Sequence, residues 1–187
     1  MNSQTWWYLS RASGIVAWVL LTVACLWGVL MVTRMLKPAD RPAWMLDLHR
    51  WLGALSVTTT GVHLAALVAD NYVHFGWAEI LVPQASEWKR WPVTMGVIAF
   101  YILIVVEASS QLMKKLPQPV WHGIHLTSYI CFGFASAHGV YAGTDRRNLL
   151  FMVFGSGLLF VLAFATVARY LQGRAKHAQR QTQRATA

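Results

Sequence analysis

Five long apolar runs constrain this chain more than any other feature. They cover residues 14–33, 46–68, 93–112, 120–141 and 149–171. A helix needs about 20 mostly apolar residues to cross a bilayer, and each run is that long. Because 56% of the residues are hydrophobic and only 12% are charged, a soluble domain of this size would have too few charged residues to cover its surface. The sequence therefore predicts an all-α integral membrane helix bundle with about five transmembrane helices.

The segments outside the runs indicate how this bundle is organised. The first run is too long for the apolar region of a secretory signal, and no small-residue cleavage site follows it before Arg34. Residues 70–91 are amphipathic and predict a short interfacial helix on the outer surface. We expect residues 1–172 to form one transmembrane domain and residues 173–187 to form a basic cytoplasmic tail.

The net charge of +9 indicates contact with lipid rather than with nucleic acid, because the basic residues lie between the apolar runs and in the tail. If the C-terminus is cytoplasmic, most of the 16 Lys and Arg residues fall inside. Only five fall outside, namely Arg11, Lys89, Arg90, Arg146 and Arg147. This bias predicts a multi-pass protein of the cell (inner) membrane with its N-terminus outside.

Four histidines lie inside two of the apolar runs. The second run contains His49 and His63 in an i, i+14 relation, and the fourth contains His125 and His138 in an i, i+13 relation. At about 1.5 Å per residue, each pair spans roughly 20 Å along its helix. Since both helices start at the cytoplasmic side, we expect His49 to face His125 near the inner surface and His63 to face His138 near the outer surface.

Two imidazole pairs at two depths are typical of haem b ligation, because each iron accepts two axial imidazoles and the porphyrin fills apolar space between helices. The sequence thus predicts two b haems, one near each leaflet, with the four histidines as axial ligands. Zinc requires three or four ligands at one point, which the separation within each pair forbids. Histidines in membranes also serve as hydrogen-bonded packing residues or in proton paths, and these readings predict a protein without haem.

The fourth run contains a geometric difficulty. At about 100° per residue, the i, i+14 relation falls about 40° short of four full turns, so His49 and His63 share a helix face. The i, i+13 relation leaves His138 about 140° away from the face of His125 on an ideal helix. We therefore expect the fourth helix to be distorted, with Gly123, Gly133 and Gly139 as the places where it deviates.

These residues carry a resemblance to a known family. The segments 48–53 (LHRWLG), 62–64 (VHL), 121–126 (WHGIHL) and 137–139 (AHG) resemble the ferric reductase-like transmembrane domain, with both histidine spacings. Residues 10–14 (SRASG) are similar to the opening of its first core helix, so the resemblance covers roughly residues 10–171. The superfamily includes ferric reductases, NADPH oxidases and the membrane subunit of the periplasmic methionine sulfoxide reductase system.

The resemblance implies that His49 and His125 ligate the cytoplasmic haem and that His63 and His138 ligate the outer one. Haem propionates are carboxylates that favour arginine. Arg50 is the candidate at the inner haem and Arg11 at the outer haem, although both also suit a snorkelling or topology-setting role. Phe132 lies midway along the fourth run. We expect its side chain to pack either between the two haems or in the hydrophobic core of the helix bundle.

Two departures from the family bear on function. Only a short basic segment follows residue 171, and the chain has no glycine motif that cradles phosphate. We therefore expect electrons to come from a separate flavoprotein reductase or from membrane quinol. The methionine sulfoxide reductase subunits lack a histidine at the position of His49, and its presence here favours a dihaem transmembrane path.

The sequence leaves three functions open. The first is an electron-transfer protein that reduces an extracytoplasmic acceptor such as ferric iron, oxygen or a redox protein. The second is the haem-binding anchor of a two-component reductase, and the third is a haem-free metal or proton transporter. His74 is a candidate for a metal substrate or a solvated surface residue, and Glu107 for a proton or quinone role or for a helix-paired carboxylate. The sequence assigns no role to His122.

Overall fold

The computed structural model describes residues 3–33, 43–70, 75–145 and 148–185. These residues form helices and turns and include no strand. In chain order the helices are α1 (Ser3–Thr33), α2 (Ala43–Ala69), α3 (Trp77–Leu81), α4 (Arg90–Gln111), α5 (Gln118–Leu126), α6 (Ser128–Ala142) and α7 (Leu149–Ala185). The chain is therefore an all-α protein, as the apolar runs predict.

In the described part of the chain, four helices are long and apolar enough to cross a membrane, namely α1, α2, α4 and α7. A bilayer offers backbone groups no water to bond, so a helix must satisfy them internally. Hydroxyl side chains in these helices follow the same rule: Thr22 donates to the carbonyl of Trp18, and Ser56 donates to that of Leu52. Four of the five predicted spans are thus single membrane-length helices.

The remaining predicted span, residues 120–141, is divided into α5 and α6 by a turn at Thr127. The backbone N–H and the hydroxyl of Thr127 both donate to the carbonyl of Ile124, at 3.0 and 2.7 Å. A threonine hydroxyl that bonds the preceding turn offers the backbone an alternative to the regular helix. The expected distortion is present, but locating it at Gly123, Gly133 or Gly139 was wrong.

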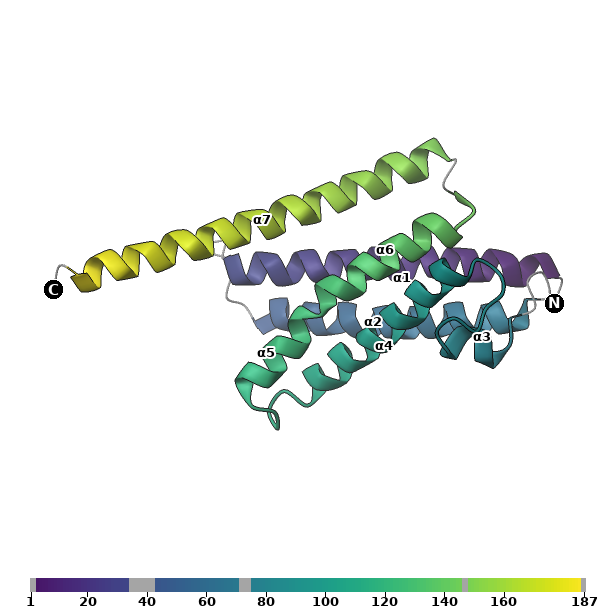
Figure 1. The fold of residues 1–187 in the computed structure, drawn as a ribbon, viewed down its shortest axis with the longest axis horizontal. Helices are drawn as coiled ribbons and strands as arrows, with labels where there is room; N and C mark the ends of the chain where they lie inside the picture. The colour runs from purple at the N-terminus through teal and green to yellow at the C-terminus, as the bar shows by residue number, and fades with distance from the viewer. Residues whose placement is uncertain (1–2, 34–42, 71–74, 146–147, 186–187) are drawn as a thin grey trace.

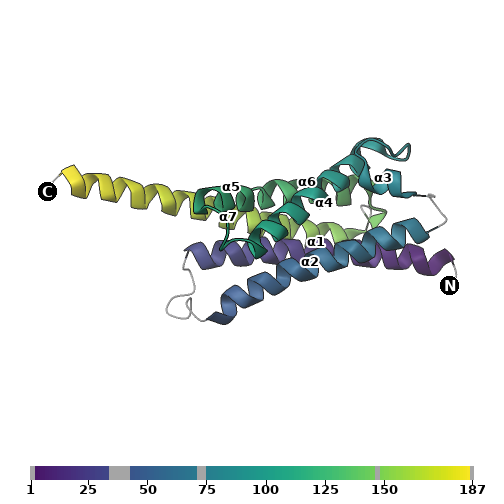
Figure 2. The same cartoon turned by 90° about the horizontal axis from the view of Figure 1, so that it is seen from below.

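The bundle is built from two antiparallel helix pairs, with α1 against α2 and α4 against α5 and α6 (Figure 1). Helix α7 packs along α1, and its C-terminal part continues beyond the other helices in both views (Figure 2). The N-terminus and α3 lie at one end of the bundle, and α5 lies toward the other. Since α7 is unbroken to Ala185, it passes through the predicted domain boundary at residue 172.

The core lies where α1, α4, α6 and α7 meet. Cys131 and Phe132 of α6 are buried there, and the Phe132 ring stacks on Trp18 of α1 at a centroid distance of 6.2 Å. The indole N–H of Trp18 donates to the hydroxyl of Ser136 at 2.9 Å, which ties α1 to α6 a second time. This aromatic core holds the two helix pairs together.

The short helix α3 matches the amphipathic segment that the sequence analysis placed at a membrane surface. Ile80 is buried against Phe75 and Val93, while Trp77 is 65% exposed. The Tyr101 hydroxyl on α4 donates to the carbonyl of Leu81 at 2.7 Å and holds the end of α3. One apolar side is thus packed on the bundle and an aromatic side is free, as expected of an interfacial helix.

Candidate functional site

The structure brings the four membrane histidines together as two facing pairs. The rings of His49 on α2 and His125 on α5 have centroids 5.8 Å apart, and those of His63 on α2 and His138 on α6 have centroids 6.4 Å apart. Because the turn at Thr127 separates His125 from His138, both rings of the fourth predicted span face α2. The deviation in the helix thus removes the angular mismatch of the i, i+13 relation.

These separations fit a metal held between two imidazoles. With a metal–nitrogen distance of about 2.0 Å, a linear arrangement places the two ring centres about 6 Å apart. The described residues contain no group of three or more His, Cys, Asp and Glu side chains that could hold a metal by themselves. Two facing imidazoles without further protein ligands suit a haem, whose macrocycle supplies the other four nitrogens.

The rings of His63 and His138 are fixed by backbone carbonyls. Nδ1 of His63 lies 2.7 Å from the carbonyl oxygen of Ser10, and Nδ1 of His138 lies 2.8 Å from that of Pro92. A carbonyl can only accept, so Nδ1 carries the proton in both rings and Nε2 is left with a free lone pair. An Nδ1–H bonded to a carbonyl is the usual support of a histidine that ligates a metal through Nε2.

A glycine four positions after each of these carbonyls makes the approach possible. A helical side chain covers the turn that precedes it, so a residue with a Cβ at that position would block the carbonyl. A Cβ on Gly14 would lie 3.0 Å from the His63 ring, and a Cβ on Gly96 would lie 2.7 Å from Nδ1 of His138. We call such a carbonyl, with the residue four positions after it, a ring seat.

The other pair has two further ring seats. A Cβ on Gly28 would lie 3.4 Å from the His49 ring, and that ring interacts with the backbone of Ala24. Nδ1 of His49 is nevertheless buried without a well-formed hydrogen bond in the described part of the chain. At His125 the seat contains Ser110, whose hydroxyl oxygen lies 3.3 Å from Nδ1.

Sequence reasoning missed these seats, although a signal for them was present. Gly14 and Gly28 stand in an i, i+14 relation on α1, and so do Gly96 and Ser110 on α4. The same interval separates His49 from His63. Since an i, i+14 relation returns nearly to the same helix face, equal spacing of small residues and histidines on neighbouring antiparallel helices indicates matched contacts.

A cavity of about 360 Å³ surrounds the His63–His138 pair. Side chains of α1, α2, α4, α6 and α7 line it, and most of them are apolar, with Trp18, Phe100 and Leu103 among the largest. Ser10, Arg11, Asp70 and Asp145 supply polar groups to the same wall. A mostly apolar cavity of this size with a few polar groups is typical of a cofactor site.

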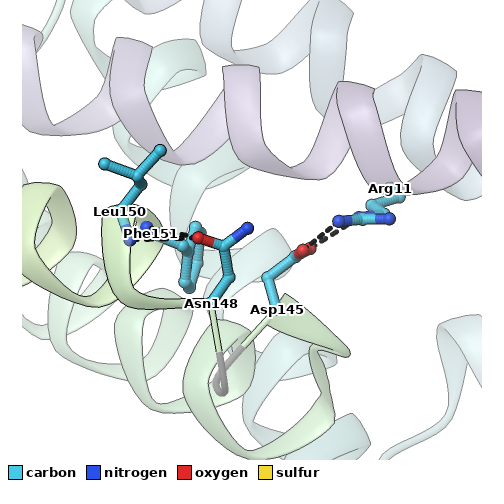
Figure 3. Close-up of polar contacts among 5 residues, drawn as sticks. All are labelled: Arg11, Asp145, Asn148, Leu150 and Phe151. Carbon is cyan, nitrogen blue, oxygen red and sulfur yellow. Dashed lines mark hydrogen bonds and ion pairs between the residues drawn. The ribbon is translucent and has the colours of Figure 1, made fainter.

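Arg11 lies in the wall of this cavity and is engaged by Asp145. Its guanidinium forms a two-pronged ion pair with that carboxylate, with Nε donating to Oδ2 at 2.6 Å and Nη2 to Oδ1 (Figure 3). The same guanidinium lies 5.1 Å from the centre of the Trp7 ring. Nearby, Asn148 accepts hydrogen bonds from the backbone N–H groups of Leu150 and Phe151 and caps the start of α7.

The second predicted arginine, Arg50, makes a 3.4 Å contact with Asp47 on the exposed side of α2. Another arginine lies near the His49–His125 pair instead. Arg169 of α7 donates to the Tyr129 hydroxyl at 3.0 Å and is close enough to His125 to interact with it electrostatically. From the sequence, Arg169 is only one of the basic residues expected on the cytoplasmic side.

The other predicted residues are placed as follows. Phe132 is in the core between the two histidine levels of α5 and α6. Glu107 accepts a hydrogen bond from Gln111 at 2.9 Å, which is the helix-paired alternative. A Cβ on Gly53 of α2 would lie 2.6 Å from the Glu107 carboxylate. His122 is exposed. His74 lies outside the described residues.

Comparison with known proteins identifies the family. Residues 13–136 match the family model described as "Ferric reductase like transmembrane component". The match covers about two thirds of the chain and includes three of the four histidines. For three of the four ring seats, it includes both the residue that supplies the carbonyl and the residue four positions later. No match was found among curated proteins or among solved structures. The chain therefore belongs to the family of ferric reductase-like transmembrane components.

Proposed function

We propose that this protein carries electrons across the membrane through two b haems, one held by His49 and His125 and the other by His63 and His138. One observation carries the proposal: two facing imidazole pairs, with ring centres 5.8 and 6.4 Å apart, lie at two levels of one membrane bundle. When bound, each haem iron supplies a one-electron couple. The family to which the chain belongs supports a redox role in the membrane.

The chain's own residues supply binding, orientation and an apolar environment. The carbonyls of Ser10 and Pro92 hold the Nδ1 protons of His63 and His138, so that both Nε2 atoms are available as ligands. At the His63–His138 level the mostly apolar wall of the cavity would cover the faces of a bound macrocycle. Trp18 and Phe132 stack on each other in the core between α1 and α6.

We further propose that the His49–His125 level is cytoplasmic and the His63–His138 level is outer, in keeping with the distribution of Lys and Arg. Electrons would come from a separate flavoprotein reductase or from quinol and pass to ferric iron, oxygen or a redox protein outside. Arg11 is the candidate partner of an outer propionate, with Asp145 as its present counter-ion. At the inner level Arg169 joins Arg50 as a candidate, because it lies nearer to His125.

A second function is favoured by the difference in ring support. The His49–His125 pair has no Nδ1 bound directly to a carbonyl in normal geometry in the described residues. A chain that retains only the outer haem would suit the membrane anchor of a two-component reductase, with the chemistry on a soluble subunit. A third possibility, a metal or proton transporter that uses the same histidines, requires no haem.

Purification in mild detergent after expression with ample haem supply separates these functions. Reduced-minus-oxidised spectra with sharp low-spin b-type bands, at a haem-to-protein ratio of two, are the expected result. A ratio of one supports the anchor function. A colourless protein contradicts both haem proposals and leaves the transporter.

Transport of electrons is tested in vesicles that enclose ferricyanide and receive dithionite outside. Vesicles with the haem-loaded protein should reduce the enclosed ferricyanide, whereas vesicles without protein should not. His63→Ala protein in the same vesicles provides the matched control, because it should lose one level of the path. Equal rates with the wild-type protein, the variant and empty vesicles would contradict electron transfer across the membrane.

A further inference from the structure

The four ring seats follow one plan, and one of them differs. In each seat the imidazole of one helix lies against the residue four positions after a backbone carbonyl of the neighbouring helix. Three seats contain glycine at that position, namely Gly14, Gly28 and Gly96, and the fourth contains Ser110. Serine is the smallest residue that places a hydrogen-bonding side chain there. The fourth seat therefore differs from the glycine seats in its hydrogen bonding as well as in the space it leaves for the ring.

The Ser110 hydroxyl lies between the His125 ring and the carbonyl that the seat would otherwise present. Its oxygen is 2.8 Å from the carbonyl oxygen of Val106 and 3.3 Å from Nδ1 of His125. The hydroxyl proton is donated to Val106, so the oxygen accepts from Nδ1–H. His125 therefore reaches its carbonyl only through a hydroxyl.

The intervening hydroxyl weakens the hydrogen bond at Nδ1 of His125. The direct bonds from His63 and His138 to carbonyls measure 2.7 and 2.8 Å. Hydrogen bonds weaken with distance, and the contact at 3.3 Å is the longest of the three. A stronger acceptor at Nδ1–H makes an imidazole a more basic ligand and favours the more positive oxidation state of the metal. A weaker acceptor therefore raises the reduction potential of the site.

We infer that Ser110 is a positioning residue that weakens His125 as a ligand and so raises the reduction potential of the His49–His125 haem. The inference rests on the proposed function, because it concerns the haem that this pair would hold. It adds that the two haems differ in potential through residues of α4 that touch neither iron. Ser110 thus sets a property that the spacing of the histidines leaves open.

Redox titration of the purified protein, monitored by haem absorbance, tests the inference with two substitutions at one position. Ser110→Gly rebuilds the glycine seat, opens the Val106 carbonyl to Nδ1 and should lower one of the two midpoint potentials. Ser110→Ala removes the hydroxyl and keeps a methyl group over the carbonyl, so it should raise that same potential. The other potential should stay unchanged in both variants.

Ser109→Ala is the matched control, because the Ser109 hydroxyl also donates to the Val106 carbonyl, at 2.9 Å, but no contact joins it to a histidine of the described chain. The two midpoint potentials of the Ser109→Ala protein should equal those of the wild type. Two haems with unchanged potentials in both Ser110 variants would overturn the inference and leave the proposed function intact. Loss of the haem in Ser110→Ala together with a retained haem of lowered potential in Ser110→Gly would support it, whereas equal loss in all three variants would show a structural role and overturn it.

Discussion

The two histidine pairs are alike in ring separation and unlike in ring support. Their centroid distances differ by only a fraction of an ångström, at 5.8 and 6.4 Å. His63 and His138 are bonded directly to backbone carbonyls, whereas His125 is bonded to a hydroxyl and His49 has no well-formed bond at Nδ1 in the described residues. The same antiparallel helices thus produce two sites of similar shape and different chemistry.

The comparison separates what helix packing decides from what single residues decide. The distance between facing rings is set by how the α1–α2 pair packs on α4, α5 and α6, because α2 carries one ring of each pair and α5 or α6 carries the other. The residues of α1 and α4 behind the rings set the hydrogen bonds at Nδ1. Substitutions behind the rings should therefore change one level at a time.

Gly96→Ala should have the largest effect of the substitutions behind the rings. The added Cβ would lie 2.7 Å from Nδ1 of His138, closer than real Cβ contacts allow, so the ring must leave its bond to Pro92. We expect haem content to fall from about two per chain to about one. The pyridine haemochrome assay measures this ratio. Gly133→Ala on the helix of His138 is the control, since Gly133 is exposed and a Cβ there meets nothing within 4 Å; an equal loss in both variants would refute the account.

Gly14→Ala and Gly28→Ala should produce smaller and graded effects. The added Cβ would lie 3.0 Å from the His63 ring and 3.4 Å from the His49 ring. The first distance requires a shift of a few tenths of an ångström, and the second is at the edge of ordinary contact. We expect partial haem loss with Gly14→Ala and near-wild-type content with Gly28→Ala. The reverse order would contradict the link between seat geometry and haem retention.

Asp145→Asn should lower stability without changing the ring seats. It removes the ion pair with Arg11, which joins α1 to the segment between α6 and α7. Since the Arg11 side chain is about one third exposed, we expect a loss of about 1 kcal/mol in the free energy of unfolding. Unfolding in mixed detergent micelles measures it. A loss equal to that of a core truncation would indicate a larger role for this pair.

Trp18→Phe should have the smallest effect. It keeps an aromatic ring against Phe132 and removes the hydrogen bond from the indole to Ser136. Hydrogen bonds between membrane helices contribute about 0.6 kcal/mol on average, so the free energy of unfolding should fall by about that amount. Ser136→Ala should match it, and the double variant should cost no more than either single one. Additive losses would show that the two side chains act independently.

Much of the fold could be predicted from the sequence, because lipid imposes simple rules. An apolar run of about 20 residues must form a helix whose backbone bonds are internal, and α1, α2, α4 and α7 follow that rule. The division at Thr127 could not be located, since a single hydroxyl can redirect the backbone without changing the hydropathy of the run. Alternation of helix direction was enough to predict which histidines face each other.

The ring seats could not be predicted from composition or hydropathy. An apolar helix in a bilayer is hydrophobic on all sides, so its sequence does not reveal which face meets a neighbour. Gly14 and Gly96 look like any other glycine in a membrane helix until the histidine rings lie against them. The pairing of Arg11 with Asp145 was hidden for a related reason, because the two residues are 134 positions apart in the sequence.

The central claim is that each level of the bundle holds its own haem between two named histidines. It is tested most directly by measuring haem content and reduced spectra in four single variants, His49→Ala, His63→Ala, His125→Ala and His138→Ala. The account predicts about one haem per chain in every variant, with one residual spectrum shared by His49→Ala and His125→Ala and a different one shared by His63→Ala and His138→Ala. Full haem content in all four variants, or residual spectra that group the two histidines of one helix, would contradict it.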